Sequence, residues 1–120
     1  MEIEITPVSV DRIDTADHTF KITTNTDTND LTSSIGSVGL LQPPILMPTA
    51  KGYRTVTGFR RIAACEGLNL TPIAARLLPP DTSPMVCAQM AVADNALQRP
   101  LNLIEQSRAY ALLNRLAGHS

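Results

Sequence analysis

Glycines and prolines divide this 120-residue chain into short segments, and the spacing of apolar residues changes from one segment to the next. Strand-like segments occupy residues 3–13, 42–47, 53–58 and 72–78. Segments with helical spacing occupy residues 29–38, 59–66, 85–96 and 103–117. The order strand, helix, strand, strand, helix, strand, helix, helix predicts an α+β or mixed α/β domain. We expect the α+β form, with a small mixed sheet, packed helices and a helical C-terminal end.

Side chains that cap helices mark three of the expected helix starts. Asn29 or Asp30 is placed to cap the first helix. Ser83, which is followed by proline after the break "PPDTSP", marks the start of the third. Asn102 and Glu105 have the N-x-x-E spacing of a capping box at the start of the last. These signals fix where the C-terminal helices should begin.

The chain length favours a single domain, residues 1–120, in which residues 82–120 form a helical subregion. Aromatic residues make up only 3%, so the core must be built from Leu, Ile, Val and Ala. Residues 14–30 are polar, rich in threonine and without a period, so we expect a loop with freedom to move.

The net charge of −1 argues against a general electrostatic grip on nucleic acid or membrane. Acids predominate in residues 1–50 and bases in residues 51–76, so the middle third could meet a small anion or pair with the N-terminal third. The N-terminus shows no secretory signal and no apolar run approaches membrane-spanning length, which makes the cytoplasm the simplest location. Cys65 and Cys87 lie among alanines in predicted helices and are read as reduced, partly buried thiols.

The stretch "YRTVTGFRRIAACEG" predicts a strand, a glycine and a helix that opens on Arg60 and Arg61. The first turn of a helix carries partial positive charge, which disfavours cations. A phosphate bound there would offset them, with Thr57 adding a hydroxyl and Gly58 allowing close approach. The alternative is that both arginines are solvated or pair with acids of the N-terminal third. The residues alone leave these two readings open.

Two further stretches carry polar groups suited to a ligand. Asp94 and Asn95, with Gln98 and Arg99 after them, offer the hard oxygen ligands that Mg²⁺ takes together with substrate phosphates. A polar helix end, in which Arg99 pairs with Asp94, is the simpler alternative. Gln42 precedes two prolines that hold it extended, and its amide could read a base edge, although an ordinary loop glutamine is the simpler alternative here too.

These stretches, taken in order, resemble the ParB/sulfiredoxin superfamily, in particular the N-terminal domain of ParB-type partition proteins. "LTSSIGSVGLLQPPIL" is similar to the family's helix and Gln-Pro loop, "YRTVTGFRRIAACEGL" to its "GERR" box, and "VADNALQRPLNLIEQSRAY" to its "ENxxRxxLNPIEEA" box. The resemblance runs from about Val8 to Leu113. It implies a domain that binds a nucleoside triphosphate, CTP in partition proteins, with Mg²⁺. It also implies nucleotide-dependent self-association in a partition or other DNA-associated protein.

Carried over residue by residue, the resemblance assigns the metal to Asp94 and Asn95. It assigns the nucleotide to a set drawn from all three boxes: Gln42, Thr57, Gly58, Phe59, Arg60, Arg61, Gln98 and Arg99. Partition proteins continue into a helix-turn-helix domain that is absent from this sequence, so we expect contact with DNA only through a further domain.

The chain also departs from the family pattern. Phe59 replaces the glutamate of the "GERR" box, Ala63 replaces an arginine, and "DHTFKITTNT" has no match to an expected arginine-containing box. Which nucleotide binds, and whether it is turned over, therefore stay open. The alternatives are a nucleotide-hydrolysing or phosphotransfer enzyme, and a protein-interaction module with a degenerate site. Sulfiredoxin chemistry is rejected, because Cys65 lies about two turns from Gly58.

Overall fold

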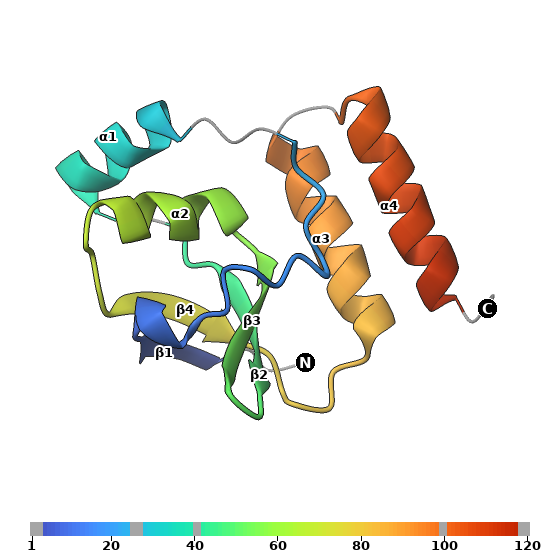
Figure 1. The fold of residues 1–120 in the computed structure, drawn as a ribbon, viewed down its shortest axis with the longest axis horizontal. Helices are drawn as coiled ribbons and strands as arrows, with labels where there is room; N and C mark the ends of the chain where they lie inside the picture. Colours follow the sequence, from blue (N-terminus) through green and yellow to red (C-terminus); the bar gives the residue numbers. More distant parts are fainter. Residues whose placement is uncertain (1–3, 25–27, 40–41, 99–100, 118–120) are drawn as a thin grey trace.

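The computed structural model describes residues 4–24, 28–39, 42–98 and 101–117, which form one mixed sheet with helices packed around it (Figure 1). Four strands lie in the order β1-β4-β2-β3. β1 pairs antiparallel with β4, β2 pairs antiparallel with β3, and β2 runs parallel to β4. The strands are β1 (Glu4–Val8), β2 (Ile45–Thr49), β3 (Gly52–Thr57) and β4 (Ile73–Leu77). The predicted small mixed sheet is confirmed.

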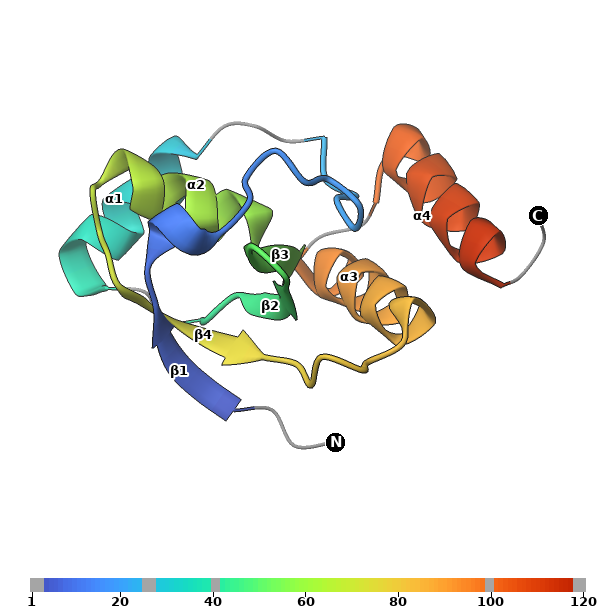
Figure 2. The same cartoon turned by 60° about the horizontal axis from the view of Figure 1, so that its bottom comes forward.

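The helices form two pairs, which lie at opposite ends of the molecule (Figure 2). One pair is α1 with α2, the other α3 with α4, and α3 also packs on β3. Their bounds are α1 (Asn29–Val38), α2 (Phe59–Gly67), α3 (Pro84–Gln98) and α4 (Leu103–Leu116), with a short 3-10 turn η1 (Val10–Arg12) after β1. The helical C-terminal end is therefore as predicted.

Each helix pair encloses its own apolar cluster of buried residues. The first joins η1, α1 and α2 to the sheet, and includes Ile35, Leu46 and Ile62. The second lies under α3 and α4 and includes Phe20 and Ile22 from the stretch expected to be a mobile loop. That stretch has no helix or strand up to Thr24, but Phe20 and Ile22 are only 2% and 1% exposed. The expected freedom to move is wrong for this part, because its apolar side chains are needed to fill a core poor in aromatic residues.

Some expected boundaries were also wrong. Thr28, not Asn29 or Asp30, is the N-cap of α1, and Asp30 lies in the first turn, where the helix dipole favours a carboxylate. β2 begins at Ile45 rather than residue 42, since the prolines before it have no N–H to donate to a sheet. The expected strand 3–13 is β1 followed by η1.

The two predicted caps in the C-terminal half are confirmed. Ser83 Oγ accepts a hydrogen bond from the Val86 N–H at 3.2 Å. The Asn102 side chain accepts from the Glu105 N–H, and the Glu105 carboxylate accepts from the Asn102 N–H. Local sequence thus decides where α3 and α4 begin.

Candidate functional site

The start of α2 is built around Gly58, which links β3 to the helix. Its φ of 91° is left-handed, a conformation that other residues rarely adopt. A Cβ there would lie 2.7 Å from Pro44 Cβ, so the loop before β2 packs directly on this residue. Gly58 is also the N-cap of α2 and offers no side chain to the first-turn N–H groups. The start of α2 is therefore close to the loop that carries Gln42, and no side chain caps it.

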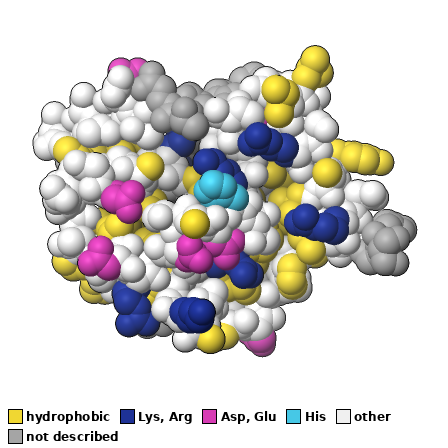
Figure 3. All heavy atoms as spheres, in the orientation of Figure 1, with side chains coloured by type: hydrophobic (Ala, Val, Ile, Leu, Met, Phe, Trp, Pro, Cys, Tyr) yellow, Lys and Arg dark blue, Asp and Glu magenta, His cyan; other side chains and the backbone are white. Residues whose placement is uncertain are grey.

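A pocket of about 120 Å³ lies at this helix start. Its lining comes from α1, α2, α3 and three connecting segments: Thr23, Leu31, Gln42, Gly58, Phe59, Arg60, Arg61, Asp94 and Asn95. Basic side chains gather on this face of the molecule, over the region between α2 and α3 (Figure 3). The fold thus brings together most of the residues that three separate stretches of sequence suggested.

Arg61 lies between the loop before β2 and helix α3. Its Nη2 donates to Gln42 Oε1 at 3.0 Å and lies 3.7 Å from Asp94 Oδ1, and its side chain is only 11% exposed. The carboxylate that balances Arg61 therefore comes from α3, not from the acidic N-terminal third. The Gln42 amide oxygen therefore helps to hold the Arg61 guanidinium in place.

Asn95 is held by its own helix. Its Nδ2 donates to the Ala91 carbonyl at 2.7 Å, which leaves the amide oxygen as the group that a ligand in the pocket can use. Asp94 beside it has a side chain that is 29% exposed. A carboxylate and an amide oxygen on the same pocket wall are hard donors, so these two residues fit a Mg²⁺ ion.

The comparison with known proteins decides the family. Residues 2–96 match the family model of the ParB N-terminal domain. The chain belongs to the ParB N-terminal domain family. The chromosome-partitioning protein ParB of Caulobacter vibrioides is 33% identical over 92 residues, which cover 72% of this chain and 29% of that protein. The chain therefore spans less than a third of the length of this curated relative.

Two solved structures resemble this ParB N-terminal domain. A Pnob8-like ParB-N domain superposes with a TM-score of 0.70 at 17% identity, over 97% of this chain and 45% of that one, a likeness that shows the fold alone. The C-terminally truncated ParB from Caulobacter crescentus, complexed with CTP-γ-S, superposes with a TM-score of 0.62 at 25% identity. That match covers 92% of this chain and 62% of that one. Both confirm the ParB-like fold.

Among the described residues, one predicted site residue, Thr57, does not line the pocket, and two others fall on parts of the chain outside the description. Thr57 is 2% exposed, and its Oγ accepts from the Ile45 N–H at 3.2 Å, so it braces β2 against β3. Gln98 lies in the last turn of α3, and its side chain is outside the described residues, as is the whole of Arg99. Roles for these three in ligand binding stay predictions.

Two residues that line the pocket were not predicted. Thr23 lies in the stretch without a period, and Leu31 lies in α1. Neither carries a local motif, so only the folded arrangement reveals them. Phe59, which replaces the family's glutamate, also lines the pocket, and its ring meets His18 edge-to-face with centroids 6.3 Å apart.

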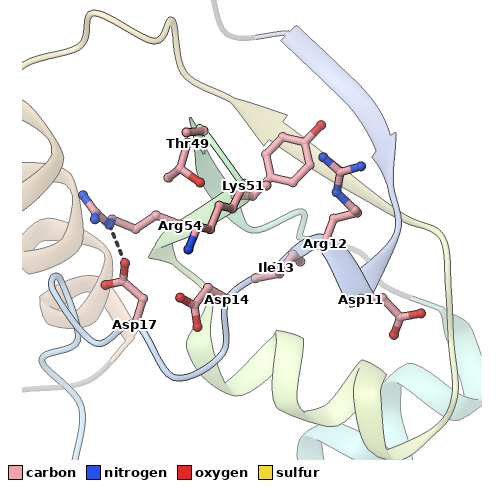
Figure 4. Close-up of a pocket in the computed structure, with 11 residues that line it drawn as sticks. Asp11, Arg12, Ile13, Asp14, Asp17, Thr49, Lys51 and Arg54 are labelled. Atoms are coloured by element: carbon pink, nitrogen blue, oxygen red, sulfur yellow. Dashed lines mark hydrogen bonds and ion pairs between the residues drawn. The ribbon is translucent and has the colours of Figure 1, made fainter.

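A larger hollow of about 450 Å³ lies between η1 and the β2–β3 turn (Figure 4). Acids and bases alternate around it: Asp11, Arg12, Asp14, Asp17, Lys51 and Arg54. Arg54 and Asp17 point toward each other, and Arg54 Nε donates to Asp17 Oδ2 at 2.6 Å. One N-terminal acid, Asp17, thus pairs with Arg54, and this hollow offers a bound ion no excess of either charge.

The cysteines do not contribute to the pocket. Cys65 and Cys87 are both fully buried, and burial raises the pKa of each thiol. A buried thiol with a raised pKa is a poor nucleophile, which agrees with the rejection of sulfiredoxin chemistry. Among the described residues, no group of three or more His, Cys, Asp and Glu side chains could hold a metal, and no helix is long and apolar enough to cross a membrane.

Proposed function

We propose that this ParB N-terminal domain binds a nucleoside triphosphate, CTP in the first instance, together with Mg²⁺. One observation carries the proposal: the uncapped, basic start of α2 and the oxygen-bearing pair on α3 face the same pocket. The similarity to a ParB that was solved with CTP-γ-S supports the choice of nucleotide. We propose residues 1–120 as the nucleotide-binding domain.

The size of the pocket limits which part of the nucleotide it can enclose. Its volume of about 120 Å³ is well below the roughly 300–1,000 Å³ of pockets that enclose drug-sized ligands. The enclosed part suits phosphate groups, which would meet Arg60, Arg61 and the first-turn N–H groups of α2. The base and sugar would then lie at the mouth, within reach of Gln42.

The contact between Arg61 and Asp94 explains why a metal belongs with the anion. Without a ligand, each charge is balanced by the other at 3.7 Å. A bound phosphate would attract Arg61, and the Asp94 carboxylate would then lack a positive charge beside it. Asp94 and Asn95 would hold the Mg²⁺, which would neutralise charge on the phosphates. Anion and cation should therefore bind better together than separately.

Calorimetry tests this proposal directly. CTP titrated with Mg²⁺ should bind saturably, and ATP, GTP and UTP should be compared under the same conditions. Arg61→Ala should weaken binding about 10- to 150-fold, because hydrogen bonds to charged groups are worth roughly 1.5–3 kcal/mol. Arg115→Ala, in the last turn of α4 and outside the pocket, is the matched control. No binding of any of the four nucleotides at millimolar concentration would sink the proposal.

The proposed consequence of binding is self-association, as part of a DNA-partition or other DNA-associated protein. α4 presents large apolar side chains to the surface, with Leu103, Ile104 and Tyr110 between 61% and 82% exposed. Light scattering should show a dimer that depends on CTP and Mg²⁺. A dimer that forms equally without nucleotide would favour the interaction module with a degenerate site. We propose that contact with DNA requires a further domain.

A further inference from the structure

Glu105 is a carboxylate that the structure buries completely, at 0% exposure. Its role in the capping box uses one oxygen, since Oε1 accepts from the Asn102 N–H at 3.1 Å. A capping box needs no burial, and glutamine can serve at the same position. Removing a carboxylate from water is costly unless it is hydrogen-bonded. The burial of Glu105 therefore points to a further role for its second oxygen.

The second oxygen holds a distant part of the chain. Glu105 Oε2 accepts from the Thr24 N–H at 2.7 Å and from the Thr24 hydroxyl at 3.2 Å, across 81 residues of sequence. Asn102 Nδ2 donates to the same hydroxyl at 3.0 Å, and Arg108 Nη1 donates to the Thr23 carbonyl at 3.3 Å. The first two turns of α4 thus grip residues 23 and 24 through four side-chain contacts.

Residue 23 is also part of the candidate pocket. Thr23 is 7% exposed and lines the pocket together with Leu31 and the start of α2. The chain that enters this position is anchored on its other side by the buried Phe20 and Ile22. The position of Thr23 is therefore set by the buried side chains before it and by the contacts that Asn102, Glu105 and Arg108 make with residues 23 and 24. We call these three residues the α4 clamp.

We propose that Glu105 is a positioning residue for the nucleotide site: its second oxygen fixes the Thr23 wall of the pocket. The part of the proposal that concerns affinity rests on the nucleotide-binding function proposed above. The geometry also ties the start of α4 to the pocket, so a displacement of α4 would loosen this wall. None of the sequence motifs assigns Glu105 more than a cap.

Glu105→Gln separates the two roles of this side chain. An amide has one oxygen, so it can keep the cap or the Thr24 contact but not both, and its NH₂ group then faces an N–H donor. Ile73→Val is the matched control, because it removes one buried methylene from β4 in the other core cluster and leaves the clamp intact. Both variants are studied well below their unfolding temperatures.

Two measurements are made on each variant. Without ligand, hydrogen exchange of the Thr24 amide should be at least tenfold faster in Glu105→Gln, and the NMR signals of Thr23 and Leu31 should shift. With CTP and Mg²⁺, affinity should fall about tenfold, whereas Ile73→Val should match the wild type in both measurements. Failure of the wild type to bind any nucleotide would refute the proposed function, while the ligand-free signals would still report on the clamp.

The proposal is overturned if Glu105→Gln leaves the Thr23 and Leu31 signals in place, or if those signals move and the affinity of a nucleotide-binding wild type does not. Thr24→Val provides a second route should Glu105→Gln fold poorly. It removes the hydroxyl contacts at 3.0 and 3.2 Å and keeps the N–H contact, so its effects should be smaller but in the same direction. Equal behaviour of Thr24→Val and the wild type in both measurements would also contradict the clamp.

Discussion

The starts of α2 and α4 solve the same physical problem in opposite ways. Every helix begins with N–H groups that have no partner within the helix. At α4, Asn102 and Glu105 satisfy two of these donors and place a carboxylate in the first turn. At α2, Gly58 offers no side chain, the first turn holds no acid, and Arg60 and Arg61 add positive charge.

The difference shows which helix start is complete without a ligand. The α4 start is closed by its own side chains and uses its carboxylate to hold a distant loop. The α2 start takes its balancing carboxylate from another helix, because Asp94 of α3 lies 3.7 Å from Arg61. A bound anion can take the place of the Asp94 carboxylate beside Arg61, because Asp94 lies on a different helix. It cannot take the place of Glu105, which is part of the cap of α4 itself.

Gly58→Ala, at the start of α2, should have the largest effect on stability and on nucleotide binding. The substitution places a Cβ 2.7 Å from Pro44 in a left-handed backbone. Strain and overpacking should together lower the free energy of unfolding by about 2–4 kcal/mol and remove nucleotide binding. Urea unfolding measures the first effect. Gly67→Ala is the control, since its Cβ would meet nothing within 4 Å, and a loss as large there would contradict the packing argument.

Part of this contrast is predictable from the sequence, because both helix starts are set by a few neighbouring residues. Ser83, Asn102 and Glu105 mark their caps within a few residues of sequence, and "TGFRR" indicates a helix that opens on two arginines. The order of strands and helices also followed from periodicity. Local pattern also placed most of the pocket residues, since each motif lies at the end of an element that the fold brings to one point.

The parts that could not be predicted depend on contacts between distant segments. Thr23 reaches the pocket because Phe20 and Ile22 are buried under α3 and α4, and nothing in a threonine-rich stretch signals that burial. The contact between Glu105 and Thr24 spans 81 residues and joins a recognisable cap to a segment without a motif. The sequence likewise does not reveal that Arg61 pairs with Asp94.

Asp94→Asn removes the carboxylate that balances the charge of Arg61 at the start of α2. With Mg²⁺, CTP affinity should fall about tenfold or more, because the metal loses a charged ligand. Without Mg²⁺, affinity for CTP should instead rise roughly threefold, since a carboxylate close to Arg61 no longer repels the phosphates. Calorimetry with and without Mg²⁺ measures both. Asp81→Asn, outside the pocket, should change neither value, and a fall under both conditions would show that Asp94 acts only through the fold.

The smallest expected effect concerns Arg54. Its partner is the Asp17 carboxylate, which we do not expect a bound anion to replace. Burial alone would raise the pKa of Asp17, but hydrogen bonds from Thr19 and Arg54 outweigh it, and the pKa is lowered. Because the pKa of Asp17 is lower in the folded state, the ionised carboxylate stabilises the fold above about pH 4. This stabilisation is lost as the pH falls through the folded-state pKa.

Asp17→Asn should therefore cost less than about 1 kcal/mol near pH 7, because the Arg54 side chain is 37% exposed and solvent screens the pair. The difference from wild type should stay level between about pH 5 and 8 and shrink below about pH 4. Urea unfolding across this range measures it, with Asp11→Asn on the same hollow as the control. Nucleotide affinity should not change, since Asp17 does not line the pocket at α2. A loss of affinity would show that the two charged regions are coupled, and that Arg60 and Arg61 depend on the N-terminal acids after all.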